Sequence, residues 1–448
     1  NRGPPPRSPT PSGRHPDRVT PTVFTVAFLL ALVVSLGIRL GLARRHVVHI
    51  AANREAVPPA FAERIALSAH QKAADYTIAK VRFGMLETLF DAVVLLALTL
   101  GGGLGLLVDW TATFSTSPLV QDLALIIAFV TLTSLLELPF TAWQMFVIEA
   151  RFGFNRMTPR LWVADLAKGA LLSALLGLPL AALALWLMNA AGQFWWLWLW
   201  IVWIVFQLLL FALYPTLIAP LFNRFTPMPE GPARDRIETL LARCGFAGRG
   251  LFVMDGSRRS SHGNAFFTGF GRSRRIVFFD TLLARLDPEE IEAVLAHELG
   301  HFKLRHVAKR LLWLAAGSMG FLAVLAWLLA SPWFYQGLGV PASVGRPGVA
   351  LILFSLVLPV FAFLLSPLAA FYSRRHEFEA DAFAVHQTSA NALSRALVKL
   401  YQDNAATLTP DPLYSAYHDS HPPAAIRIAR LGVNADKTSP AALAGRPA

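Results

Sequence analysis

Residues Phe194 to Pro215 read FWWLWLWIVWIVFQLLLFALYP, an apolar run that contains no charged side chain. An α-helix rises about 1.5 Å per residue, so a run of this length can cross the roughly 30 Å of hydrocarbon in a lipid bilayer. Comparable runs lie near residues 21–42, 86–108, 119–140, 169–190, 311–330 and 349–371. The sequence therefore predicts a mostly α-helical, polytopic membrane protein with about seven transmembrane helices.

The composition of the chain favours the same class of protein. Of its 448 residues, 55% are hydrophobic and 15% are charged, whereas soluble domains average about 25% charged residues. The formal net charge is +12, but the Lys and Arg residues lie mostly in a few loops between the apolar runs. We therefore expect contacts with anionic membrane lipids and no nucleic-acid partner. The single cysteine, Cys244, excludes an internal disulfide framework.

Lys and Arg alternate between successive loops, which predicts the orientation in the membrane. The loops after the first and third spans and the 216–310 segment are rich in both, whereas Asp109–Ser117 contains neither. Because short, positively charged loops stay in the cytoplasm, the amino terminus is expected outside, with residues 216–310 and the C-terminal tail in the cytoplasm. The arginines of residues 1–20 run against this orientation. The amino-acid composition is rich in Ala, Arg and Leu, as is typical of bacteria, so we expect the protein in a bacterial inner membrane.

Ionisable side chains interrupt several of the apolar runs, among them Asp91 and Glu137. Charge is costly in hydrocarbon, so such groups usually face a water-filled interior or a partner. We therefore expect the helices to enclose a polar chamber. For a residue near a helix end, such as Glu87, the alternative is that the side chain extends to the membrane surface.

The sharpest local signal is the sequence HELGH at His297–His301. It ends a helical pattern in which Asp287 is the expected N-cap and Pro288 the first helical residue. The two histidines then lie one turn apart on one face, as two imidazoles must to bind one Zn²⁺ ion. Glu298 beside them can take the proton of a water molecule activated by such an ion. The alternative is a polar helix end at the membrane surface.

A third metal ligand is expected because catalytic zinc usually has three protein ligands and one open position. The candidate lies in SRRHEFEADAFA, residues 373–384, directly after the last span. Glu377 and Asp381 share one helical face, which suits one carboxylate on the metal and a second that accepts the ring N–H of a ligating histidine. Glu379 points roughly 200° away from Glu377, so we expect it to face the neighbouring arginines and to leave the site unaffected. The alternative is a solvated acidic face.

Two further segments fit a site that cleaves peptides. Asn264–Gly271 and Arg275–Asp280 predict a β-hairpin around a Gly-containing turn, and an extended edge strand beside a metal can pair with a substrate backbone. His418–Pro423, with Arg427 beyond it, supplies donors that can stabilise an oxyanion. Read alone, each segment is an ordinary hairpin or loop. Three histidines without such a context are expected on the polar surface: His46, His49 and His306.

Taken together, these segments resemble the type I CAAX prenyl endopeptidases, which are integral-membrane zinc metalloproteases with seven spans. The resemblance covers most of the chain from about residue 70 onward, and it rests on residues 146–155, 214–227, 264–270, 297–301, 373–381 and 420–423. It implies one Zn²⁺ ion per chain, held by His297, His301 and Glu377, with Glu298 as the general base. It also implies substrate or transition-state contacts from Asn264, His421 and Arg427, and a large water-filled chamber with the zinc near its cytoplasmic end.

The resemblance implies a peptide or protein substrate that carries a prenyl lipid. Because most bacteria lack prenylated CAAX proteins, a membrane-protein quality-control peptidase without prenyl specificity is the alternative. A site-two-type intramembrane protease fits less well, since the charged sequence FKLRHVAKR follows His301. A transporter with a structural zinc site would need a fourth protein ligand, and the sequence offers none beside the three candidates.

The expected division of the chain follows from these motifs. We expect a disordered tail at 1–20, an N-terminal membrane domain with five spans at 21–215, a metalloprotease segment at 216–310, two further spans at 311–371, the C-terminal part of the catalytic domain at 372–435 and a tail at 436–448. Residues 216–310 and the C-terminal part would together form a small α+β catalytic domain.

Overall fold

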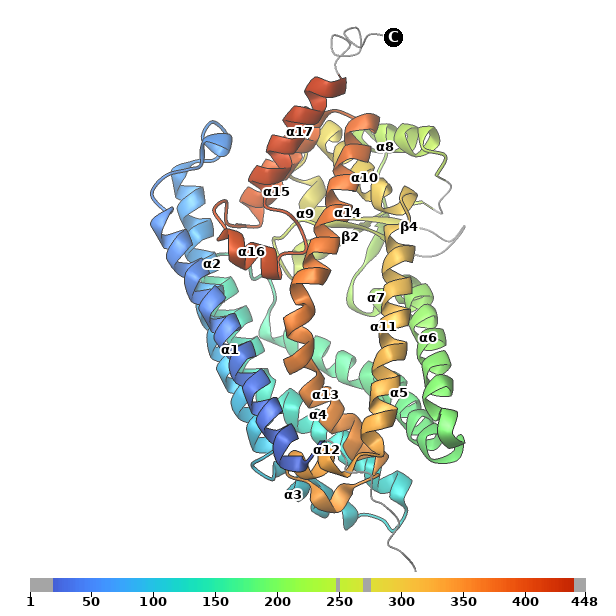
Figure 1. The fold of residues 1–448 in the computed structure, drawn as a ribbon. Coiled ribbons are helices and arrows are strands. Elements are labelled where there is room, and N and C mark those ends of the chain that lie inside the picture. The colour runs from blue at the N-terminus through green and yellow to red at the C-terminus, as the bar shows by residue number, and fades with distance from the viewer. Residues whose placement is uncertain (1–18, 247–249, 269–274, 439–448) are drawn as a thin grey trace, which may run out of the picture.

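The computed structural model describes residues 19–246, 250–268 and 275–438 (Figure 1). The disordered tail predicted for residues 1–20, most of the tail predicted for 436–448 and the turn of the predicted hairpin therefore lie wholly or largely outside the described residues. Within the described chain, six helices are long and apolar enough to cross a membrane, or seven if one bent pair counts as a span. The predicted polytopic helical fold is thus confirmed.

The N-terminal half of the chain forms a helical bundle that runs along most of the length of the molecule (Figure 1). Its helices are α1 Pro21–Ala52, α2 Leu67–Leu98, α3 Gly103–Ala112, α4 Pro118–Trp143, α5 Pro159–Ala190, α6 Trp195–Leu213 and α7 Ala219–Phe222. A π-helical turn, Gln144–Glu149, extends α4, and a second one, Tyr214–Ile218, joins α6 to α7. Several helices therefore continue beyond the apolar run that predicted them.

The span predicted at 86–108 is not one straight helix. It consists of the end of α2 and the start of α3, whose axes differ by 54°. Three successive glycines cause the break: Gly102 has a left-handed φ of 80°, and a Cβ on Gly101 would lie 2.8 Å from the carbonyl oxygen of Ala97. A turn this tight requires residues without a side chain.

The second half of the chain combines a small sheet with helices. The helices are α8 Pro232–Arg243, α9 Asp280–Leu283, α10 Pro288–Lys303, α11 His306–Leu329, α12 Pro332–Gly337, α13 Pro347–Ala362, α14 Ser366–Gln387, α15 Ala390–Asp403, α16 Pro412–His418 and α17 Ala424–Thr438. The strands are β1 Phe225–Pro227, β2 Leu251–Met254, β3 Ala265–Thr268 and β4 Arg275–Phe279, in the order β1-β2-β4-β3. β3 pairs antiparallel with β4, so the predicted hairpin strands are confirmed, and β3 lies at the sheet edge.

Two hydrophobic cores are connected by one long helical segment. One core lies among the membrane helices, and the other joins β4 and α10 to α8, α14 and α15. A single 3-10 turn, Phe363–Leu365, links α13 to α14, so the chain continues from the membrane bundle directly into the second core (Figure 1). This continuity places residues of α14 beside α10.

Polar cavities lie between the helices, as the ionisable residues in the apolar runs predict. One cavity of about 370 Å³ is lined by Asp91 and Glu137. It shares Arg39 with a cavity of about 690 Å³ and with a more apolar cavity of about 830 Å³. Three cavities thus meet at one arginine of α1.

The loop after the first span lies at the same end of the molecule as the second core (Figure 1). Phe61 and Ile65 of this loop are buried against Val398, Leu408 and Ala424. The alternation of positive loops requires these two parts of the chain to share one side of the membrane, and their packing agrees with that requirement.

Candidate metal centre

Helix α10 carries the two histidines and begins as its sequence predicts. Asp287 and Glu290 form a capping box, in which each side chain accepts from the backbone N–H of the other, and Pro288 is the first helical residue. These contacts satisfy N–H groups that the first turn leaves without helical partners. The apolar face, with Ile291 and Leu295 buried in the second core, then fixes the rotation of the helix, so that His297 and His301 face α14.

A close crossing of α10 and α14 brings the ligand candidates together. Gly300 lies against Ala380, so closely that a Cβ on Gly300 would be 3.0 Å from the Ala380 Cα and 3.1 Å from its carbonyl oxygen. Only a glycine allows the two backbones to approach to this distance. The crossing point lies between His297 and His301 on one side and between Glu377 and Asp381 on the other.

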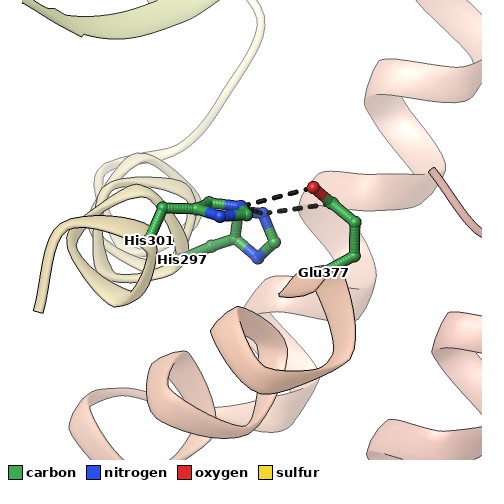
Figure 2. A group of neighbouring side chains, drawn as sticks. All are labelled: His297, His301 and Glu377. Atoms are coloured by element: carbon green, nitrogen blue, oxygen red, sulfur yellow. Dashed lines mark hydrogen bonds and ion pairs between the residues drawn. The ribbon is translucent and has the colours of Figure 1, made fainter. Parts of the chain in front are cut away.

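His297, His301 and Glu377 point toward one another from the two helices (Figure 2). The Nε2 atoms of the two histidines are 3.2 Å apart. Glu377 Oε1 lies 3.3 Å from His301 Nε2, and Glu377 Oε2 lies 3.5 Å from His297 Nε2. The three side chains offer ligand atoms that all lie within 4.8 Å of one another.

The spacing of these atoms fits a tetrahedral metal ion. With bonds of about 2.0–2.1 Å, two ligand atoms of a tetrahedral zinc ion lie about 3.3–3.4 Å apart. The 3.2 Å between the two Nε2 atoms is close to this value, and each Nε2 atom lies at a similar distance, 3.3 or 3.5 Å, from one of the two Glu377 oxygens. The Glu377 carboxylate is almost fully buried, and its Oε2 accepts no well-formed hydrogen bond within the described chain although His421 Nδ1 lies 2.8 Å away. A buried oxygen of this kind is suited to a cation.

Asp381 and Arg427 hold the outer side of His297. The Nδ1 of His297 lies 2.8 Å from Asp381 Oδ1, and Arg427 donates to both carboxylate oxygens of Asp381, at 2.6 and 2.9 Å. Burial disfavours an imidazolium here, but the hydrogen bond to Asp381 and the nearby Glu377 carboxylate outweigh it and raise the pKa of His297 to about 9. Carboxylates that stabilise a charged imidazole would also stabilise a metal cation.

His421 lies at the boundary between these buried groups and a cavity. Its side chain is 64% exposed, its Nδ1 contacts Glu377, and it lines the cavity of about 690 Å³. Arg427, by contrast, is only 8% exposed, and its Nη1 lies 3.7 Å from Glu377 Oε2. The arginine that the sequence places near a transition state is therefore engaged mainly with Asp381.

Two other predicted site residues have no such partners. Glu298 is half-buried on α10, and within the described chain no hydrogen bond or ion pair engages its carboxylate. Asn264 is exposed directly before β3, where its side chain accepts from the N–H of Ala265. Among the described residues, no hydrogen bond joins Asn264 to either histidine or to Glu377.

The sequence interpretation of two histidines is wrong, and Glu379 has a contact that the sequence did not predict. His46 and His306 are buried, not on the polar surface: the Nδ1 of His46 accepts from the N–H of Asp411 at 3.1 Å. Glu379 contacts a neighbouring arginine as expected, but it also lies 3.0 Å from His306 Nε2. The sequence carries no signal for this contact, because His306 reaches it through a sharp turn at Arg305, which has a left-handed φ of 58°.

Comparison with known protein families assigns both halves of the chain. Residues 46–224 match the family model described as CAAX prenyl protease N-terminal, five membrane helices, and residues 227–434 match peptidase family M48. The chain belongs to the type I CAAX prenyl protease family. It is a membrane-embedded metalloendopeptidase that acts on peptide or protein substrates, and neither the transporter nor the quality-control alternative is favoured.

Named relatives and a solved structure resemble this protease over most of their length. It is 39% identical to CAAX prenyl protease 1 homolog of Arabidopsis thaliana over 326 residues, which are 71% of this chain and 75% of the relative. It is 35% identical to CAAX prenyl protease 1 of Saccharomyces cerevisiae, over 72% of this chain and 74% of the relative. The crystal structure of S. mikatae Ste24p superposes with a TM-score of 0.85 at 28% identity, over 91% of this chain and 99% of that one.

Proposed function

We propose that this protease binds one Zn²⁺ ion per chain through His297, His301 and Glu377. The observation that carries the proposal is the convergence of three ligand groups: the two Nε2 atoms lie 3.2 Å apart, close to the edge of a zinc tetrahedron, and the two Glu377 oxygens lie 3.3 and 3.5 Å from them. Two imidazoles and one carboxylate are a common donor set of catalytic zinc sites, which keep a fourth position open. When bound, such an ion supplies Lewis-acid chemistry, because it polarises carbonyl oxygens and lowers the pKa of water.

We assign the proton transfers to Glu298. It follows His297 directly on α10, and its half-buried carboxylate has no other partner in the described chain. In this position it would accept a proton from the attacking water and return it to the leaving amine. A carboxylate held by a salt bridge could not exchange a proton so readily.

The other site residues support these groups from two sides. Asp381 orients His297 through Nδ1, and Arg427 fixes Asp381 with two hydrogen bonds. His421, at the edge of the cavity of about 690 Å³, is the donor best placed to stabilise an oxyanion that enters from this cavity. Asn264 precedes the edge strand β3, where it would contact a substrate backbone that pairs with the strand.

We infer that the catalytic domain combines residues 216–310 with 372–435, and that it lies on the cytoplasmic side of a bacterial inner membrane. The shared core supports the first part, since α10 packs against α14 and α15 in one cluster of buried side chains. The alternation of positively charged loops supports the orientation. Membrane lipids would then surround the apolar helices that leave large side chains exposed, such as Leu171 and Leu312.

For the substrate, we propose a peptide with a lipid-modified C-terminal segment. The names of the relatives, CAAX prenyl protease 1, are one support. The other is the mostly apolar cavity of about 830 Å³, which is lined by Trp313, Leu368 and Phe363 and also by His376, directly before Glu377, and Ser420, directly before His421. A lipid chain and the peptide attached to it could therefore occupy adjoining spaces.

The test uses purified full-length protein and two variants. Glu298→Gln should retain zinc and fold normally but lose activity by orders of magnitude, because an amide cannot take the proton of water. Glu377→Ala should lose the metal itself. Parent protein incubated with unmodified and farnesylated peptides, with and without a zinc chelator, then decides the substrate. Equal turnover for Glu298→Gln and parent protein at equal zinc content would contradict the assignment, and cleavage of both peptides at one rate would favour a peptidase without prenyl specificity.

A further inference from the structure

His301 contacts a second set of side chains on the side of the ring that faces away from Glu377. Its Nδ1 lies 3.0 Å from His306 Nδ1, and His306 Nε2 lies 3.0 Å from Glu379 Oε2. Glu379 Oε1 accepts from Arg375 Nε, also at 3.0 Å. A continuous series of hydrogen bonds thus runs from an exposed arginine on α14 to a ring of the metal centre.

The direction of these hydrogen bonds is fixed at Glu379. An ionised carboxylate can only accept, so the proton between Glu379 and His306 belongs to His306 Nε2. A neutral imidazole with its proton on Nε2 has an accepting Nδ1, so the proton between the two histidines belongs to His301 Nδ1. His301 is left with a lone pair on Nε2, the atom that lies 3.3 Å from Glu377 Oε1.

We propose that Glu379 is a positioning residue that acts through His306 to hold His301 in the tautomer and orientation in which Nε2 can bind a metal ion. This proposal rests on the proposed function of the three ligand candidates. It gives the two ligating histidines equivalent supports, because Asp381 holds Nδ1 of His297 directly and Glu379 holds Nδ1 of His301 through one intermediate ring. Such outer partners fix ring orientation and increase the basicity of the ligand.

The surroundings of His306 suit an intermediate of this kind. Its side chain is 4% exposed, and the ring of His376 stacks on it with centroids 4.0 Å apart and planes 8° from parallel. Stacking prevents the ring of His306 from rotating away from His301. The turn at Arg305 that starts α11 places the ring there, since a continuing α10 would carry residue 306 to another face.

A second metal ion is the competing interpretation, because His306, His376 and Glu379 also offer three ligand atoms within 4.8 Å of one another. An ion bound by an imidazole lies close to the plane of its ring. The two stacked rings have nearly parallel planes set apart from one another, so one ion cannot lie in both planes. A metal on His306 Nε2 would also move its proton to Nδ1, where it would oppose the proton on His301 Nδ1.

The experiment measures zinc affinity and does not depend on activity. Full-length protein and the variants Glu379→Ala, Glu379→Gln and His306→Phe are stripped of metal and titrated with Zn²⁺ against a chromogenic chelator. Cobalt-substituted samples give visible absorption spectra that report the coordination geometry. We expect Glu379→Ala and His306→Phe to lower the affinity by about 10- to 100-fold and to alter the cobalt spectrum. Glu379→Gln should recover part of the loss, because its amide oxygen still accepts from His306.

Two controls separate the possible outcomes. Arg375→Gln removes the outermost contact but leaves Glu379 and His306 in place, so it should bind zinc nearly as the parent does. The double variant of Glu379 and His306 should lose no more affinity than either single variant, because the pair acts as one unit. Parent affinity and spectrum in both His306→Phe and Glu379→Ala would overturn the proposal. A parent protein that binds two zinc ions, of which His306→Phe loses one, would also overturn the proposal. A parent protein that binds no zinc would instead refute the proposed function.

Discussion

Replacing Gly300 by alanine tests whether the helix crossing sets the metal centre. The added Cβ would lie 3.0 Å from the Ala380 Cα, about 0.4 Å inside the 3.4 Å at which ordinary van der Waals contact begins. Its nearest neighbours are backbone atoms, so α10 and α14 must move apart. Metal sites tolerate errors of only about 0.2 Å in ligand distances, and this interface separates the two histidines from Glu377.

The expected size of the effect follows from two opposing contributions. Overpacking a tight interface costs about 1–3 kcal/mol, whereas alanine in a helix is about 1 kcal/mol better than glycine. If the strain remains in the metal-free protein, its stability should therefore fall by about 0–2 kcal/mol. If the strain appears in metal binding, zinc affinity falls by about 5- to 150-fold, since 1.4 kcal/mol corresponds to a factor of ten.

The assay compares zinc affinity and thermal unfolding in three proteins: the parent, Gly300→Ala and the control Gly317→Ala. A Cβ on Gly317 would meet no atom within 4 Å, so this substitution should leave zinc affinity unchanged. Parent affinity in Gly300→Ala would refute the argument that the close approach of the helices fixes the ligand distances. Equal losses in both variants would point to a general effect of alanine in these helices.

Three further predictions concern stability and orientation. Asp381→Asn should destabilise the fold by about 3–5 kcal/mol, seen in thermal unfolding, because it leaves the buried arginine that it binds without its principal anion. Lys399→Met should lower the melting temperature at pH 7, and the difference from the parent should shrink below about pH 4. The reason is that the Lys399 ammonium lowers the pKa of the Asp287 carboxyl in the folded protein. The ion pair therefore stabilises the fold fully above the ordinary carboxyl pKa, and this stabilisation is lost as the pH falls through the lower pKa of the folded state. Cys244 is buried, and burial raises the pKa of its thiol, so it is a poor probe of the orientation in the membrane. The exposed Thr239 is a better position, tested as Thr239→Cys in a Cys244→Ser background. An impermeant thiol reagent should label this variant in inside-out vesicles and not in intact cells.

The sequence by itself determined the class of fold and named the residues of the candidate metal centre, because both depend on patterns within single segments. Apolar runs long enough for a bilayer appear as such in the chain, and the spacing of His297 and His301 follows from the helical repeat. The pairing of Glu377 with Asp381 on one face follows from the same repeat. The N-cap at Asp287 and the start of α10 at Pro288 could also be read from the sequence.

Only the tertiary structure decided what lies around those motifs. The break of the span at 86–108, the burial of Arg427 against Asp381 and the contact of Glu379 with His306 each depend on a turn or on packing between distant segments. A helical repeat gives the direction of a side chain relative to its own helix, but it does not say which other helix occupies that direction. Glu379 points away from Glu377, as the helical repeat requires. The turn between α10 and α11, where Arg305 has a left-handed φ, nevertheless brings His306 within 3.0 Å of it.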